Sequence, residues 1–248
     1  MASAETSALP AGAEPPVLRS VGILHEDDDL LVADKPGNLP CHPGGRYCGN
    51  TLLHILRVRG GDVGNLRIIN RLDRETSGIV LVAKTDAMAR SLAGQFRRHT
   101  AQKEYTVLVH GAFPAHLEAR GWLLPDTGSA IRKKRRFVTG DAPPAPGAES
   151  AETDFELVEA RDGISRVLAR PRTGRTHQIR ATLLSLGFPV VGDKIYGLDE
   201  TFFLRFIADA LTDADRARLM LPRQALHASA LTVVIDGARR TFTSLPPF

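Results

Sequence analysis

The stretch that decides the fold is residues 69–78, INRLDRETSG. A run typical of a β-strand leads into this stretch at residues 67–69 (RII), and another follows it at residues 79–83 (IVLVA). Two short apolar runs on either side of turn-forming residues predict strand, tight turn and strand, with the turn closed by Ser77 and Gly78. This arrangement would hold a charged side chain rigidly at the mouth of a sheet.

The charged side chain at the centre of the predicted turn is Asp73, which lies close to Arg71 and Arg74 in sequence. Neighbouring guanidinium groups are expected to lower the pKa of this carboxyl and to keep it ionised. An ionised carboxylate on a rigid scaffold suits a nucleophile or base that works on a polyanion. The alternative is that Asp73 only caps the turn, as aspartate often does.

A second stretch, residues 170–180 (RPRTGRTHQIR), follows a predicted strand and opens a predicted helix. Together with residues 70–78 it resembles the two signature motifs of the RluA-type RNA pseudouridine synthases. Several motifs in the family's order are much stronger evidence than one, and the resemblance covers the chain from about Val21 onward. The further matching segments are residues 26–37 (EDDDLLVADKPG), 103–105 (KEY), 192–197 (GDKIYG) and 223–228 (RQALHA).

The resemblance implies isomerisation of specific uridines in rRNA or tRNA to pseudouridine. In this reaction the bond from uracil N1 to ribose C1′ breaks, and the base turns and rejoins through C5. Because no redox change and no external energy are needed, we expect no cofactor.

The resemblance implies that Asp73 is the catalytic aspartate and that Arg180 pairs with its carboxylate. It also implies that Tyr105 stacks on the flipped uracil and can assist removal of the C5 proton. Whether Asp73 forms a covalent adduct or acts as a base stays open.

Each of these residues also has an ordinary structural interpretation. Tyr105 could be a half-buried strand tyrosine, and Arg180 could be an exposed arginine on a helix. Arg71, which the resemblance places in the RNA stack after base flipping, could be a surface charge at a strand end. Asn70 departs from the family, since many members have histidine there. We expect a changed hydrogen bond or RNA contact at that position rather than lost chemistry, because Asp73 is intact.

Basic residues are the expected contacts to RNA phosphates. The densest run is residues 132–136, RKKRR, which we expect to lie outside the catalytic constellation. The alternative is a solvated strand and loop, and in a eukaryotic protein the same run could serve nuclear targeting. The RNA-binding residues predicted from these patterns are Arg71, Arg132, Lys133, Lys134, Arg135, Arg136 and Arg175.

The remaining pattern predicts an α+β fold. Strands outnumber helices and mostly join through hairpins, which predicts a mainly antiparallel mixed sheet with flanking helices. The strongest hairpin signal is Asp236-Gly237 between two apolar runs. Predicted strands are residues 21–25, 30–33, 103–111, 116–124, 129–138, 153–159, 164–170, 226–235 and 238–243, and predicted helices are residues 51–56, 86–96, 176–186 and 213–219.

Composition bounds the class of protein. The chain has 248 residues, of which 43% are hydrophobic, enough for a single catalytic domain over residues 18–248 after a disordered tail over residues 1–17. Residues 141–150, rich in Ala, Pro and Gly, are expected to form a mobile loop.

A pI of about 9.3 and a net charge of +4 favour an anionic partner, here RNA. Two cysteines fit a reducing compartment, and no apolar run is long enough to cross a bilayer. We therefore expect a cytoplasmic protein that works as a monomer.

Other functional classes fit the sequence less well. A non-catalytic RNA-binding protein that keeps the fold has no use for a buried charged pair, and a glycosidase usually needs two catalytic acids. Cys41, His42 and Cys48 could hold a metal, but the paired Cys-x-x-Cys spacing is missing, and we expect a loop without metal. The His-x-Glu and Pro-Cys-x-x-Cys signature of zinc nucleobase deaminases is absent too.

Overall fold

The computed structural model describes residues 14–60 and 65–248. Its strands are β1 (Gly22–Glu26), β2 (Leu30–Lys35), β3 (Arg67–Ile68), β4 (Ser77–Ala83), β5 (Gln102–His110), β6 (His116–Pro125), β7 (Arg135–Thr139), β8 (Glu149–Arg161), β9 (Ile164–Pro171), β10 (Leu226–Ile235) and β11 (Ala238–Thr243). Its helices are α1 (Leu52–Gly60), α2 (Asp86–Arg97), α3 (Gln178–Ser185), α4 (Thr201–Ile207) and α5 (Asp213–Leu219).

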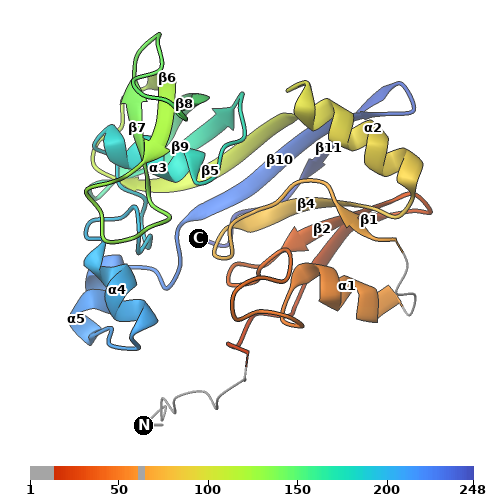
Figure 1. The fold of residues 1–248 in the computed structure, drawn as a ribbon, viewed down its shortest axis with the longest axis horizontal. Helices are drawn as coiled ribbons and strands as arrows, with labels where there is room; N and C mark the ends of the chain where they lie inside the picture. Colours follow the sequence, from red (N-terminus) through yellow and green to blue (C-terminus); the bar gives the residue numbers. More distant parts are fainter. Residues whose placement is uncertain (1–13, 61–64) are drawn as a thin grey trace.

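The described strands form one mixed sheet in the order β1-β2-β4-β10-β5-β9-β8-β6-β7, with β3 added to β4 and β11 added to β10. The pairing of β4 with β10 is parallel, and the other described pairings are antiparallel. The predicted α+β fold with a mainly antiparallel mixed sheet and flanking helices is confirmed. Figure 1 shows β5 and β10 running side by side through the middle of the molecule.

Strand β4 is buried on both faces, which explains its unbroken apolar sequence. Val80 and Val82 belong to the core cluster that includes Leu52 and Leu56 of α1, whereas Ile79 and Leu81 alternate with them and belong to the cluster under α2. Because successive side chains of a strand point to opposite faces, α1 and α2 cover opposite faces of this part of the sheet (Figure 1).

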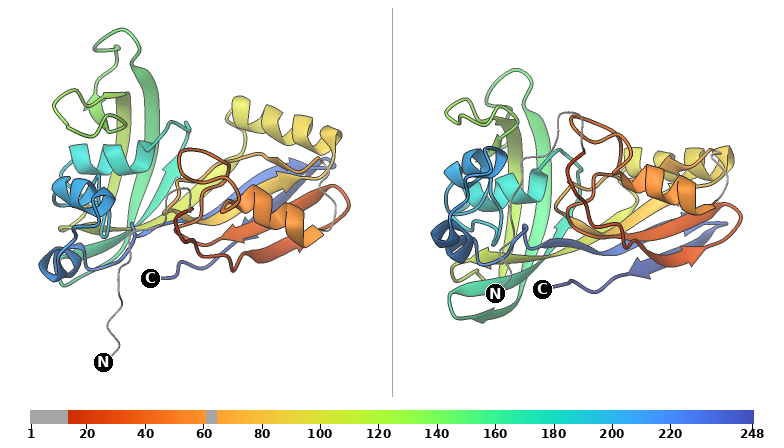
Figure 2. Two further views of the ribbon diagram at one scale, coloured as in Figure 1. Left: turned by 60° about the horizontal axis from the view of Figure 1, so that its bottom comes forward. Right: turned by 90° about the horizontal axis from the view of Figure 1, so that it is seen from below.

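The other half of the sheet packs against α3. Ile179 and Leu183 of α3 share a core cluster with Val107 of β5, Phe155 of β8 and Val167 of β9. The short helices α4 and α5 lie beside α3 at the same end of the molecule (Figure 2). Helix α4 was not predicted from its sequence TFFLRFI, since an almost continuous apolar run has no helical period.

The parallel contact between β4 and β10 depends on Gly78. Its φ is +109°, and a Cβ at this position would lie 2.3 Å from the carbonyl oxygen of Ala228 on β10. Any larger residue would push the two strands apart. Ser77 beside it bonds from Oγ to His227 Nδ1 at 2.9 Å, which ties the start of β4 to the start of β10.

Two segment boundaries differ from the predictions. Within the predicted tail, Glu14 contacts the body of the protein, because its carboxylate accepts backbone N–H groups from Gly49 (2.7 Å) and Asn50 (2.6 Å). Residues 1–13 of the predicted tail lie outside the described residues. The loop predicted over residues 141–150 ends earlier, because β8 already begins at Glu149. No helix in the described part of the chain is long and apolar enough to cross a membrane.

Candidate active site

Asp73 lies in a loop between β3 and β4 rather than in a tight turn. Strand β3 ends at Ile68 and β4 begins at Ser77, so the Ser-Gly pair starts the strand instead of closing a turn. The prediction of a tight turn is therefore wrong, although the two strands do pair in antiparallel register, with Ile68 opposite Val82.

Side chains fix the backbone of this loop ahead of Asp73. Asn70 Nδ2 donates to the carbonyl of Ile79 (3.0 Å) and Asn70 Oδ1 accepts from the N–H of Leu81 (2.8 Å), so the amide group takes the place of a strand partner along β4. The thiol of Cys41 lies against the backbone of Leu72, with Sγ 3.4 Å from its nitrogen and 3.5 Å from its oxygen. Asn70, which stands where many family members have histidine, therefore forms hydrogen bonds within the protein.

A buried lysine fixes the loop after Asp73. Lys35 on β2 is fully buried, and its Nζ donates to the carbonyls of Pro36 (3.0 Å), Leu39 (2.9 Å) and Arg74 (3.2 Å). Burial lowers the pKa of Lys35 to about 8. One ammonium group therefore joins two loops that are far apart in sequence, and one of its contacts is to the residue that follows Asp73.

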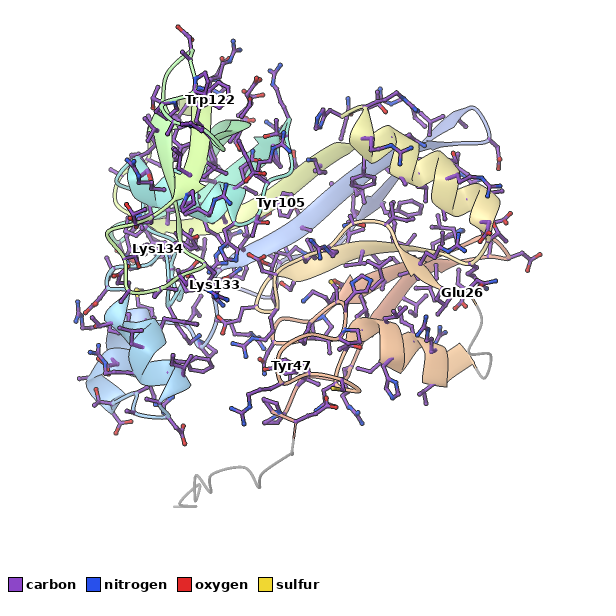
Figure 3. All side chains as sticks on the ribbon, viewed as in Figure 1. Glu26, Tyr47, Tyr105, Trp122, Lys133 and Lys134 are labelled. Carbon is purple, nitrogen blue, oxygen red and sulfur yellow. The ribbon has the colours of Figure 1, made fainter. Side chains whose placement is uncertain are left out.

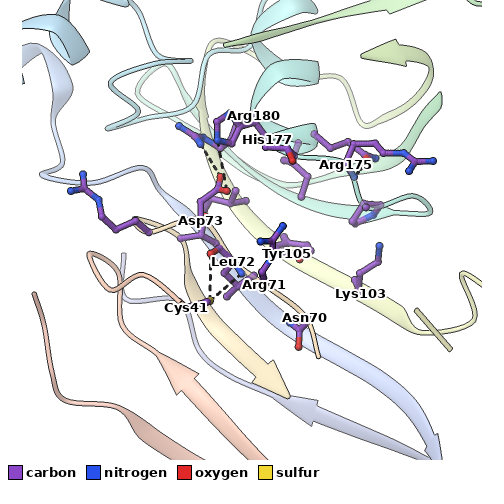
Figure 4. A pocket seen from close by; sticks show the side chains of 18 of the residues that line it. Cys41, Asn70, Arg71, Leu72, Asp73, Lys103, Tyr105, Arg175, His177 and Arg180 are labelled. Atoms are coloured by element: carbon purple, nitrogen blue, oxygen red, sulfur yellow. Dashed lines mark hydrogen bonds and ion pairs between the residues drawn. The ribbon is translucent and has the colours of Figure 1, made fainter. Parts of the chain in front are cut away.

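Arg180 on α3 joins two carboxylates. Its Nη1 donates to Asp73 Oδ2 at 2.8 Å (Figure 4). Its Nε and Nη2 donate to Asp193 Oδ2 and Oδ1 at 2.6 and 2.9 Å. The side chain of Arg180 is only 6% exposed, so it is not a surface arginine of a helix. The expected contact with Asp73 is present, but the stronger, two-pronged contact is to Asp193, which was not among the predicted site residues.

The charge of Arg180 decides the protonation state of Asp73. Burial of the carboxyl raises its pKa, but the charge and the hydrogen bond of Arg180 lower it. The lowering outweighs the effect of burial, so the pKa of Asp73 lies below its ordinary value. Asp73 is therefore ionised at neutral pH. The sequence neighbours do not contact it as expected, because Arg74 bonds to Glu75 at 3.0 Å and Arg71 is exposed.

His177 also lies beside Asp73. The Tyr196 hydroxyl accepts the backbone N–H of Arg135 (2.8 Å) and lies 2.9 Å from His177 Nδ1. The other ring nitrogen of His177, Nε2, lies 3.9 Å from Asp73 Oδ1. Burial lowers the pKa of His177 to about 4, so the ring stays neutral at pH 7. His177 and Tyr196 both belong to matched motifs, which is the signal that could have found them.

Asp73 opens into a pocket of about 570 Å³ (Figure 4). This volume suits a small-molecule-sized group such as a flipped nucleotide. Tyr105 of β5 and the apolar side chains of Leu72 and Leu226 line the pocket together with Arg180. Burial and the charge of Asp73 raise the pKa of Tyr105, so the phenol is protonated and cannot accept a proton as phenolate in the free protein. The three predicted catalytic residues therefore meet at one cavity.

The basic run at residues 132–136 is not a uniform charged surface. Lys134 is 11% exposed and bonds to Glu200 at 2.5 Å, and Arg135 pairs with Glu149. The interpretation as RNA contacts is therefore not supported for these two residues, whose charges are used within the fold. The strand predicted from residue 129 begins only at Arg135, and the preceding basic residues form a loop.

The remaining predicted RNA-binding residues face solvent or the pocket. Arg132 and Arg136 are exposed, and Arg71 and Arg175 line the main pocket. Lys133 lies 4.7 Å from the Phe203 ring and borders a smaller cavity of about 110 Å³ together with Asp73 and Arg180 (Figure 3 locates Lys133). The expectation that the whole run lies outside the catalytic constellation is wrong for Lys133.

The candidate metal ligands have other surroundings. Cys41 is buried against Leu72, whereas Cys48 is exposed. Within the described ranges, no three His, Cys, Asp or Glu side chains are grouped so that they could hold a metal ion. The absence of a metal requirement stays a prediction.

We expect activity to survive removal of zinc. Treatment with 1,10-phenanthroline, with magnesium left in place to keep the RNA folded, should leave the rate of pseudouridine formation unchanged. Loss of activity that zinc restores would contradict this and would point back to Cys41, His42 and Cys48.

Comparisons with known proteins show the family of this chain. The family model described as RNA pseudouridylate synthase matches residues 29–185. The dual-specificity RNA pseudouridine synthase RluA of Escherichia coli (strain K12) is 34% identical over 94% of this chain and 95% of its own length. The mitochondrial tRNA pseudouridine(32) synthase of Saccharomyces cerevisiae is 36% identical over 76% of this chain, which spans only 40% of that relative. A solved structure of human RNA pseudouridylate synthase domain containing 1 has a TM-score of 0.73 and 26% identity, over 95% of this chain and 87% of that one. The chain belongs to the RluA-type family of RNA pseudouridine synthases.

Proposed function

We propose that Asp73 is the catalytic group with which this RNA pseudouridine synthase isomerises uridine. The observation that carries the proposal is the ion triad in which Arg180 holds Asp73 at the wall of the pocket and is itself held by buried Asp193. A carboxylate that is ionised, fixed and open to a nucleotide-sized cavity can attack ribose or accept a proton. A protein that only binds RNA has no need of such a carboxylate.

The reaction is balanced within one nucleotide. The N1–C1′ bond breaks, the base turns, the C5–C1′ bond forms, C5 loses a proton and N1 gains one. Asp73 supplies the anion that stabilises or captures the sugar carbon, and Arg180 keeps this anion ionised. Tyr105 offers an aromatic face and a neutral hydroxyl to the detached base, since its pKa is raised. The apolar walls of the pocket keep the base from leaving during the turn.

We propose rRNA, tRNA or both as the substrate. The printed names of the relatives support this range, since one acts on uridine 32 of tRNA and another has dual specificity. The deciding experiment is pseudouridine mapping of total RNA from cells that express the wild-type protein or its Asp73→Asn variant. A uridine that is modified only with the wild type identifies the substrate, and identical maps would refute the proposal.

We also propose that the protein works in the cytoplasm as a monomer. Support comes from two cysteines that are unpaired in the described residues, as a reducing compartment would leave them. Fluorescence microscopy of the tagged protein and sedimentation analysis test the two statements separately.

RNA binding is expected to depend on part of the basic run only. Replacing Arg132, Lys133 and Arg136 with serine should reduce the log–log salt slope of RNA affinity, by about 0.7 for each phosphate that is no longer bound in a single strand and about 0.9 in a duplex. The matched variant is Lys134→Ser/Arg135→Ser, which should lower thermal stability with a smaller effect on the slope, because these two side chains pair with Glu200 and Glu149. Equal slopes for the wild type and the triple variant would make those three residues ordinary solvated surface.

A further inference from the structure

Lys103 is a lysine of the pocket wall to which the catalytic chemistry assigns no role. It lies on β5 two residues before Tyr105, so both side chains point to the same face of the sheet, about 7 Å apart along the strand. Glu104 between them points to the opposite face, where it accepts a hydrogen bond from Arg170 at 2.8 Å. Lys103 therefore has no carboxylate from its own strand, and its Nζ donates to the carbonyl of Thr173 at 2.6 Å.

The charge of Lys103 is not compensated by the described part of the protein. Lys103, Arg175 and Arg71 all line the main pocket, and none of them forms an ion pair within the described ranges. Arg175 instead donates from Nε to the carbonyl of Ser150 at 3.1 Å. Burial and the charge of Arg175 lower the pKa of Lys103 to about 8. Two neighbouring cations without an acidic partner repel one another, and an anion bound between them would remove this cost.

The surroundings leave room for such an anion. Gly174 lies beside the ammonium group, and a Cβ at this position would come 3.6 Å from Lys103 Nζ. Glycine therefore leaves this side of the ammonium uncovered, in the short loop that also carries Thr173 and Arg175. Figure 4 shows Tyr105 between Asp73 and Lys103, so the three side chains follow one another along the pocket.

We propose that Lys103 and Arg175 form a phosphate subsite that holds the RNA backbone at the target nucleotide while its base lies on Tyr105. The proposal that the nucleotide is a target uridine rests on the proposed function. Phosphate binding at the subsite can be measured without turnover. Lys103 would fix the distance between the captured backbone and Asp73, and so would place the sugar carbon against the carboxylate. The rival role for Lys103 is a purely structural one, in which it only anchors the Thr173 carbonyl.

The test measures affinity for single-stranded oligouridylate, which offers uridine in every register, in an Asp73→Asn background without turnover. Lys103→Gln keeps a donor for the Thr173 carbonyl but removes the charge, and we expect it to reduce the log–log salt slope by about 0.7. Lys103→Arg should keep the slope of the wild type. The matched control is Lys84→Gln, since Lys84 also donates to a backbone carbonyl, that of Asp27 at 2.7 Å, but lies away from the pocket.

The pH dependence of oligouridylate affinity gives a second measurement. It does not need the Lys103→Gln variant, in which the charge is removed. Phosphate binds the protonated ammonium, so affinity should be close to its maximum below about pH 7 and should fall as the pH rises through the pKa of Lys103. With a pKa of about 8 in the free protein, the fall between pH 7 and 8.5 is about fourfold, and Lys103→Arg should be nearly flat. The other groups of this pocket with shifted pKa values do not change charge in that range: Asp73, His177 and His42 have lowered pKa values, and Cys41 and Tyr105 have raised ones.

The outcomes separate the two proposals. A salt slope unchanged by Lys103→Gln, or an equal pH dependence in Lys103→Arg and Asp73→Asn alone, would overturn the subsite and leave the isomerase proposal intact. A reduced slope together with identical pseudouridine maps would keep the phosphate subsite and refute the isomerase proposal.

Discussion

Replacing Asp73 with asparagine is expected to abolish pseudouridine formation, with a rate loss of more than roughly 10⁴-fold. The amide has a similar volume, but it can neither attack the sugar as an anion nor accept a proton. The fold should survive, because Arg180 keeps its two contacts to Asp193 when Asp73 is neutral. The measurement is single-turnover conversion of the mapped RNA, alongside thermal unfolding of the same preparation.

The matched control is Asp154→Asn, which neutralises a carboxylate on β8 that pairs with Arg172 at 2.9 Å and does not line the pocket. This variant should keep full activity. An Asp73→Asn protein that retains activity near the wild-type level would remove Asp73 from the reaction, whatever its position in the pocket.

Replacing Arg180 with alanine is expected to cost stability as well as activity. The change leaves the fully buried carboxylate of Asp193 without its partner, and breaking a buried ion pair in this way typically costs about 3–5 kcal/mol. Arg180→Lys keeps one positive charge but cannot reach both carboxylates with a planar fork, so it should fall between alanine and the wild type. Chemical denaturation gives the stability and single-turnover kinetics give the activity.

A double variant separates the structural from the catalytic role of Arg180. Combining Arg180→Ala with Asp193→Asn removes the unpaired buried charge, so stability should largely return while activity stays low, because Asp73 still lacks its cation. The surface control Arg172→Ala breaks an exposed pair and should change stability by less than about 1 kcal/mol. Recovery of activity along with stability would mean that Arg180 acts only through the fold.

The sequence motifs predicted which residues would meet, but not how they are held. Asp73, Tyr105 and Arg180 could be named because each belongs to a short motif that resembles the family. Asp193 also lies in a matched segment, residues 192–197, but its pairing with Arg180 was not predicted, because it depends on a loop in which the backbone N–H groups of Ile195 and Tyr196 bind its oxygen. Contacts of this kind depend on loop geometry and leave no periodic pattern.

For a related reason, the sequence did not show which residues of the basic run are neutralised within the protein, and RNA contact by Arg132, Lys133 and Arg136 stays a prediction. A run of charges in sequence shows how many cations are present, but the partners that neutralise Lys134 and Arg135 lie 66 and 14 residues away. The turn at Asp73 was misjudged because β3 is only two residues long, so most of the chain between the strands is held by side chains instead of by strand pairing. Hairpins such as β10–β11, which depend on two local residues, were predicted correctly.

The place of β10 in the sheet has a consequence for how the protein acquires its activity. This strand lies between β4 and β5, and it brings His227 to Ser77 although 150 residues separate them in the chain. Contacts between such distant segments form slowly, because a long loop must close before they give any stabilisation. During synthesis, the two halves of the sheet can form only as separate units until residues 226–235 have left the ribosome. We therefore expect the nascent chain to stay inactive until this strand is inserted, so that the final step of folding switches the enzyme on.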